Sequence, residues 1–263
     1  MGARSTIAAG LVGLILSAGL VGCGGLAGDL GGSESGVAVD LAASPAPGMR
    51  FAYRVRTTAT ISGAGVRELA ESQKSASTVQ RYVVEVTAAT VDSFDVRVTG
   101  ESLQETVVAR FGRDWTPLKF GVEREGQYED ADLSTFPVLG EAFQAARDLS
   151  GHWTVGEARP WERTMTIPPL LSVRMRGTST LKRITRLDGR RAAEFDYVAS
   201  GEGSYGLSRL QMKVSGQHWV DLATGFPLAA KTSAPGSFMQ EGEAVQMELK
   251  EERTLSRSES AGL

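Results

Sequence analysis

Residues 51–61 read FAYRVRTTATI, and this stretch decides the fold class. Apolar or small side chains take every second position from Phe51 to Ile61, while mostly polar side chains take the positions between them. Successive side chains of an extended strand point to opposite faces, so this alternation separates a buried face from a solvated one. The stretch therefore predicts a half-buried β-strand that packs its Phe51 face on a core.

Similar alternation recurs on both sides of one helical stretch, and turn signals such as Asp188-Gly189 separate the runs. Further strands are expected at 82–86, 94–99, 107–111, 115–122, 161–167, 171–187, 193–200, 210–214, 219–222, 226–232 and 245–255. Short strands at this density are typical of an antiparallel meander. The sequence thus predicts a mainly β fold, an antiparallel meander that forms a curled sheet or an open half barrel with one short helix.

The helix is expected at residues 138–149. Gly151 follows this stretch as a stop signal. One stripe at helical spacing carries its larger apolar side chains and a small one, Leu139, Phe143, Ala146 and Leu149. We expect the stripe to pack on the sheet, so that the helix is a spacer between two β segments.

The two β segments resemble each other. Residues 94–101 read FDVRVTGE and residues 195–202 read FDYVASGE. Downstream, Trp115-Thr116-Pro117-Leu118 resembles Trp219 together with Phe226-Pro227-Leu228. A meander can reuse the same turns by chance, but we favour a diverged repeat. The prediction is a single β domain at 48–258 made of two similar halves, 48–135 and 151–258, with a frayed tail at 259–263.

The N-terminal region has the features of a secretory signal. Arg4 precedes an apolar run from Thr6 to Leu20, which is shorter than the about 20 apolar residues that span a bilayer. The run ends in Leu20-Val21-Gly22-Cys23, which resembles the lipobox of bacterial lipoproteins. An ordinary cleaved signal with a chance cysteine is the alternative.

That resemblance implies removal of residues 1–22, attachment of diacylglycerol to the Cys23 thiol and acylation, for example with palmitate, of the new amino group. The protein would then be a membrane-anchored lipoprotein of the cell envelope, facing the periplasm or the exterior. Gly24 stands where an Asp commonly retains such proteins in the inner membrane. This favours the outer membrane if the bacterium is Gram-negative.

Residues 23–47 consist of the lipobox cysteine and a stretch at 24–47 that is rich in Gly, Ser, Ala and Pro. This composition predicts a flexible tether between the lipidated cysteine and the β domain. An ordered docking arm is the open alternative, because Val37, Val39 and Leu41 alternate with other residues.

Composition narrows the function classes. The chain has 263 residues, 41% of them hydrophobic, with 28 Lys and Arg against 31 Asp and Glu. A sizeable core is therefore possible, and without a basic block nothing indicates nucleic-acid binding. Cys23 is the only cysteine, so an exported chain has no disulfide to stabilise it.

Searches for catalytic and metal motifs predict no cofactor and no metal. His152 and His218 are the only histidines, each before a Trp, and they do not supply a metal site. Gly201–Gly206 matches the dinucleotide pattern Gly-x-Gly-x-x-Gly, yet strand-like alternation follows it, which favours a hairpin loop. The acidic runs at 123–132 and 241–252 are interpreted as solvated, although weak Ca²⁺ binding by the first is an alternative.

By architecture alone the chain resembles half-barrel lipoprotein carriers of the LolA/LolB and LppX type. It is also similar to envelope lipoproteins that carry a late Thr-Gly-x-Pro turn, here Thr224-Gly225-Phe226-Pro227; that second resemblance implies no activity. We therefore expect a non-enzymatic protein, anchored to the membrane through Cys23, that binds a lipid or another hydrophobic ligand or serves as an envelope scaffold. The candidate ligand-binding face is apolar and includes Phe51, Tyr53, Val84, Phe94, Val173 and Met212.

A hydrolase or glycan-processing enzyme of the envelope is the alternative. It would need a cleft with an activated Ser or with two carboxylates within about 10 Å of each other.

Overall fold

The computed structural model describes residues 36–66, 74–132, 136–167, 171–205, 208–240 and 242–259. The expected signal peptide at 1–22, the lipidation site Cys23 and the first part of the expected tether lie outside these residues. So does most of the expected frayed tail. These expectations stay predictions.

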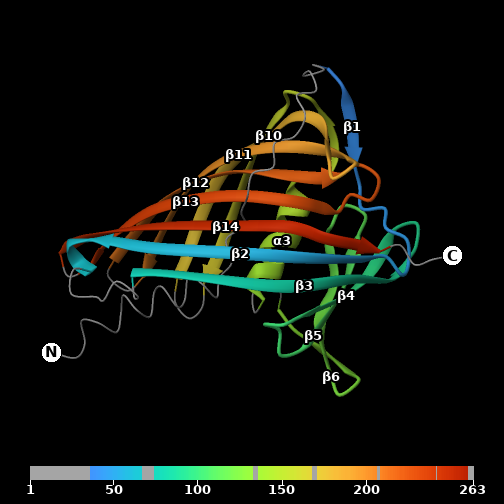
Figure 1. Ribbon diagram of the computed structural model, residues 1–263, viewed down its shortest axis with the longest axis horizontal. Helices are drawn as coiled ribbons and strands as arrows, with labels where there is room; N and C mark the ends of the chain where they lie inside the picture. Colours follow the sequence, from blue (N-terminus) through green and yellow to red (C-terminus); the bar gives the residue numbers. More distant parts are fainter. Residues whose placement is uncertain are drawn as a thin grey trace.

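The protein is built on one antiparallel sheet of 12 strands that curls around a helix (Figure 1). The first half of the chain supplies β2 (Arg50–Gly63), β3 (Ser75–Ala89), β4 (Ser93–Gly100), β5 (Thr106–Gly112), β6 (Pro117–Arg124) and β7 (Gln127–Asp130). Helix α3 (Pro137–Asp148) follows. The second half supplies β9 (Ala158–Ile167), β10 (Leu171–Leu187), β11 (Arg190–Tyr205), β12 (Ser208–Asp221), β13 (Pro227–Gln240) and β14 (Glu243–Glu259). The mainly β class, the curled open sheet and the one short helix are confirmed.

Each half of the chain forms one meander, and the two meanders meet at β2 and β14. The strand order is β7-β6-β5-β4-β3-β2-β14-β13-β12-β11-β10-β9. Strands β2 and β14 pair from Val245 opposite Gly63 to Glu259 opposite Arg50. The first and last long strands of the chain are thus central neighbours, while β7 and β9 are the edges. Glu259, the first residue of the expected frayed tail, is still part of β14.

Each half of the chain has a corresponding corner, between its fourth and its fifth strand. Trp115 precedes β6 with φ 64°, and Gly225 precedes β13 with φ 70°. The Trp115 N–H donates to the Gly112 carbonyl at 2.9 Å, and the Gly225 N–H donates to the Asp221 carbonyl at 2.8 Å. The left-handed backbone, which favours glycine, is thus used at equivalent points of both halves.

The strand pairing at the two corners also corresponds. A register shift precedes the pair Phe111–Pro117 in one half and the pair Val220–Pro227 in the other. Pro117 and Pro227 are therefore equivalent, as the sequence resemblance suggests. The structure pairs Trp115 with Gly225 rather than with Trp219, which lies within β12.

Residues 36–47 are an ordered arm and not a tether. They include β1 (Ala38–Leu41), which pairs with β8 (Gly151–Thr154). Leu41 is 3% exposed and Ala43 is fully buried. The backbone N–H of Ala43 donates to the Arg113 carbonyl at 2.7 Å, and that of Ser44 to the Thr224 carbonyl at 2.8 Å. The prediction of a flexible segment over 36–47 is wrong because its small side chains let the backbone lie directly on both corners.

The acidic run at 123–132 is not a loop throughout. Strand β7 takes residues 127–130 and pairs with β6, from Arg124 opposite Gln127 to Gly121 opposite Asp130. Its side chains are exposed, as expected for an edge strand. The Arg124 guanidinium bridges Glu105 and Glu129, so the charges of this run are partly paired within the chain.

Candidate functional site

The predicted apolar face is buried, but it is divided between two clusters. Phe51, Tyr53, Val84 and Phe94 belong to a group that packs with α3, called here the helix cluster. Val173 and Met212 belong to a second group at the far ends of the long strands, called the distal cluster, together with Ile61, Leu210, Val245 and Met247 among others. The expectation of one continuous face is therefore wrong, because the curl of the sheet brings distant strands together in two separate places.

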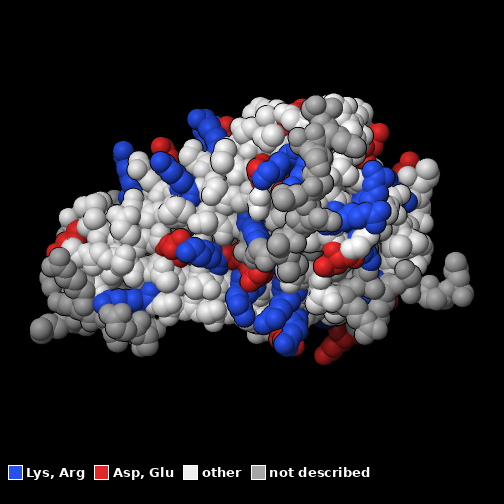
Figure 2. All heavy atoms as spheres, turned by 45° about the horizontal axis from the view of Figure 1, so that its top comes forward, with Lys and Arg blue, Asp and Glu red and all other residues white. Residues whose placement is uncertain are grey.

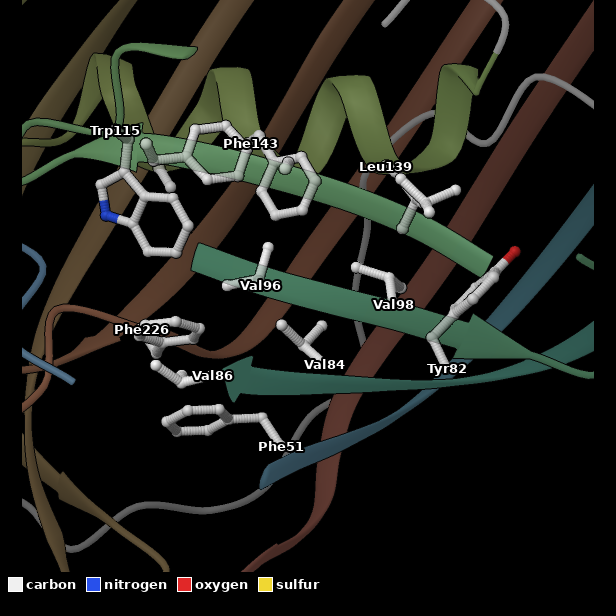
Figure 3. Close-up of a cluster of buried hydrophobic side chains, with 14 of the residues drawn as sticks. Phe51, Tyr82, Val84, Val86, Val96, Val98, Trp115, Leu139, Phe143 and Phe226 are labelled. Atoms are coloured by element: carbon white, nitrogen blue, oxygen red, sulfur yellow. The ribbon is translucent and has the colours of Figure 1, made fainter. Parts of the chain in front are cut away.

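Aromatic rings fill the helix cluster (Figure 3). Phe51 stacks on Phe226 at a centroid distance of 4.1 Å, and Trp115 meets the Phe226 ring at 4.8 Å. From α3, the Phe143 ring points at the sheet and lies 4.6 Å from Phe111. Such offset and edge-on contacts stabilise more than their buried area alone. Trp115 and Phe226 come from the two corresponding corners, so the cluster joins both halves.

A small cavity lies between α3 and the sheet, with a volume of about 40 Å³. Its lining is apolar and aromatic apart from one charged side chain and two tyrosines: Tyr53, Val55, Tyr82, Val84, Trp115, Leu139, Ala142, Phe143, Ala146, Phe226, Pro227 and Arg253. Ligand pockets usually measure about 300–1,000 Å³. The interior is therefore largely filled while α3 occupies this position.

A polar belt crosses the inner face of the sheet between the two clusters. One row of residues in register runs from β10 to β2 and consists of Ser179, Tyr197, Gly216, Thr232, Glu251 and Thr57. His218 and Arg253 lie in the adjacent row, each opposite Ala230. The polar members of both rows are buried. The expectation that Glu251 belongs to a solvated run is wrong, because Glu251 is 2% exposed.

A sequence signal for the belt was present in β14. Val245, Met247 and Leu249 face the core, and the same alternation continues to Glu251 and Arg253. Charged side chains in phase with a buried apolar face indicate buried charge. Buried charges are costly unless they are paired, so such positions deserve scrutiny as functional sites.

Arg253 and Glu251 form a loose buried pair. The Arg253 Nη2 atom lies 3.8 Å from Glu251 Oε1, which is beyond hydrogen-bond distance. Within the described chain this Nη2 atom has no hydrogen-bond partner. Arg253 is 5% exposed and also lines the cavity, so its guanidinium connects the polar belt with the apolar space under α3.

The two histidines lie in different environments. The His218 ring packs on the Tyr197 ring at 4.8 Å, and burial, aided by the charges of Arg253 and Arg163, lowers the pKa of His218 to about 3. His152 is exposed, and its Nδ1 lies 3.0 Å from Asp40 Oδ1, which links β8 to β1. Its neighbour Trp153 is fully buried on the other face of β8. Among the described residues, no group of His, Cys, Asp and Glu is arranged to hold a metal ion.

Basic side chains of β10 are paired with carboxylates on the outer surface. Arg174 and Arg176 both bond Glu162, and Lys182 bonds Asp196. Figure 2 shows basic side chains beside acidic ones on the face it displays. These paired charges therefore form a mixed polar surface.

An open groove of about 360 Å³ lies on the outer surface across β11 to β14. The pairing of β12 with β13 is interrupted here, between Met212–Gly236 and Ser215–Ser233, and Pro235 lies in the gap. Glu202 is its one carboxylate, and the cavity under α3 has none. Neither hollow provides the carboxylate pair that a glycosidase requires. In the described part of the chain, no helix has the length and apolarity needed to cross a membrane.

Comparisons with known proteins identify no family. No protein-family model matches the chain, and no curated protein does. Among solved structures, Ail, the attachment invasion locus protein of Yersinia pestis, is 7% identical, covers 79% of this chain and 99% of its own, and has a TM-score of 0.17. An outer membrane channel from Pseudomonas putida F1 is 8% identical and has a TM-score of 0.21, and the match covers 82% of this chain and 97% of the channel. MucB in complex with MucA(peri) is 12% identical and has a TM-score of 0.15, and the match covers 81% of this chain and 94% of the matched chain. Likeness at these scores carries no argument about function.

Proposed function

We propose that this protein is a lipid-anchored component of a bacterial cell envelope whose β domain binds a hydrophobic chain, without catalysing a reaction. The lipobox at Cys23 supports the anchor, on the periplasmic or exterior side and at the outer membrane where one exists. The observation that carries the binding function is the apolar cavity between α3 and the curled sheet.

In this proposal a ligand gains access when α3 moves, because the present volume of about 40 Å³ is too small for an acyl chain. The two ends of the helix differ in how they are held. Past the C-terminal end, the Trp153 indole N–H donates to the Leu149 carbonyl at 2.9 Å, and Asp148 lies 3.6 Å from Arg163. At the N-terminal end, Phe136 makes no side-chain capping hydrogen bond, and its ring packs on the Phe120 ring at a centroid distance of 5.8 Å. Displacement of α3 from the sheet would open the cavity.

The binding function is tested by filling the cavity. Ala142 of α3 lines it, so Ala142→Leu should occupy the space and weaken binding of a fluorescent polyene fatty acid and of its methyl ester by about tenfold or more. Ala88→Leu, at an exposed position of β3, is the matched control and should leave both affinities unchanged.

Fluorescence titration of purified protein measures these affinities. If the unaltered protein binds neither probe, the carrier function is contradicted and an anchored scaffold remains. If the Ala142→Leu variant binds both probes as well as the unaltered protein does, the site under α3 is wrong.

The anchor is tested separately with Cys23→Ser. Without the thiol, no diacylglycerol can be attached, so the variant should leave the membrane fraction and lose incorporated radioactive palmitate. Recovery of fully labelled variant in the membrane fraction would contradict the lipobox.

A further inference from the structure

The cavity under α3 has an apolar lining with a single charged side chain. Arg253 is the one charged side chain in its lining, and its Nη2 atom has no hydrogen-bond partner within the described chain. A guanidinium has five N–H donors in a planar fork that matches a carboxylate. Glu251, its nearest acidic neighbour at 3.8 Å, is not part of the lining. Arg253 thus lies close to Glu251 and also contributes to the lining of the apolar space.

The two tyrosine hydroxyls of the lining are already occupied. The Tyr53 hydroxyl donates to the Pro227 carbonyl at 3.0 Å. The Tyr82 hydroxyl donates to Gln80 at 2.6 Å and accepts from Ser102 at 3.2 Å. Arg253 is therefore the charged residue of the lining, and its Nη2 atom is a spare donor for a ligand.

We propose that the ligand of this site is a single-chain fatty acid whose carboxylate binds the Arg253 guanidinium while its chain lies between α3 and the sheet. This inference rests on the proposed function and adds the chemical class of the ligand. A charge-assisted hydrogen bond from the buried Nη2 atom to a carboxylate supplies the partner that Glu251, at 3.8 Å, does not provide. An uncharged ester or alcohol of the same length gains the apolar contacts alone.

The test compares a fluorescent polyene fatty acid with its methyl ester on the purified full chain. The unaltered protein should bind the acid about tenfold or more tightly than the ester. Arg253→Met removes the charge with similar length, so this preference should disappear, mainly through loss of affinity for the acid. Arg56→Met, on the exposed face of the neighbouring strand β2, is the matched control and should keep the preference.

Each outcome decides one question. Equal affinity of the unaltered protein for acid and ester overturns the carboxylate site and leaves the proposed binding function intact, whereas failure to bind either probe overturns both. A preference that survives in the Arg253→Met variant also overturns the assignment. If that variant does not fold by circular dichroism, Arg253→Lys decides, since it keeps the charge without the planar fork and should retain a reduced preference for the acid.

Discussion

Buried charge governs the behaviour of single residues in this protein. Glu251 and Arg253 are 2% and 5% exposed, and the interior also holds the neutral ring of His218. Removing ions from water costs several kcal/mol per ion, and a loose pair offsets this cost incompletely. A carboxylate bound to Arg253 would offset part of this cost, in line with the ligand role proposed for that residue.

His218 should make stability depend on pH. Its pKa is lowered from 6.5 to about 3 in the folded protein, so in acid the unfolded chain takes up a proton that the folded protein refuses. The contribution of His218 to the free energy of unfolding is therefore largest at pH values above 6.5, the usual histidine pKa. It falls as the pH drops from 6.5 towards 3. Between about pH 7 and about pH 5 this histidine should account for a loss of about 2 kcal/mol.

Urea unfolding of the unaltered protein and of His218→Gln at both pH values measures this loss. The variant lacks the titrating ring, so its own decrease should be smaller by that amount, with the remaining decrease due to other groups. Equal decreases in the two proteins would show that His218 is protonated without cost in the folded state.

At the level of elements, the ordered arm holds the two corresponding corners together. Gly225 has φ 70°, and a Cβ there would collide with the Ala42 carbonyl oxygen of the arm. Gly225→Ala should therefore displace the arm and lower the free energy of unfolding by about 2–4 kcal/mol, from left-handed strain and overpacking together. Denaturant unfolding measures the loss, and proteolysis should cut the arm sooner.

The matched control for the arm is Gly126→Ala. Gly126 has φ 80°, and nothing lies within 4 Å of a Cβ built there. Its substitution should cost about 1–2 kcal/mol from backbone strain alone. The arm has no stabilising role at this corner if the two alanine variants lose the same free energy.

For the molecule as a whole, the pairing of β2 with β14 is the junction on which the sheet depends. Lys250 of β14 lies between Thr58 of β2 and Ser233 of β13. Lys250→Pro should remove a ladder hydrogen bond at the centre of the sheet and cost about 3 kcal/mol or more. The natural Pro235 of β13 fits this expectation, since it lies where the pairing with β12 is interrupted.

Asp130→Pro is the comparison for the junction. It lies in the edge strand β7, where the Ala131 N–H donates to Phe120 and the Asp130 N–H points away from the sheet. Its cost should stay below about 1 kcal/mol. Thermal unfolding followed by circular dichroism measures both variants, and similar losses would contradict a central role for the junction.

Local sequence patterns were enough to predict most of the long strands, the helix and the buried face of β2. Side-chain direction in a strand depends on the local backbone, so the alternation from Phe51 to Ile61 was enough to place one face of β2 in the core. The stripe at Leu139 and Phe143 likewise located α3, because helical spacing is also local. The Pro-Leu repeat at Pro117 and Pro227 identified equivalent corners for the same reason.

Which elements meet could not be predicted from local patterns, because strand pairing depends on contacts between residues far apart in the chain. The pairing of β2 with β14 crosses most of the sequence and leaves no local pattern. The arm over 36–47 looked like a linker by composition, yet the two corners supply its hydrogen-bond partners. Burial of Glu251 and Arg253, and hence the polarity of the cavity, likewise arises from the curl of distant strands around α3.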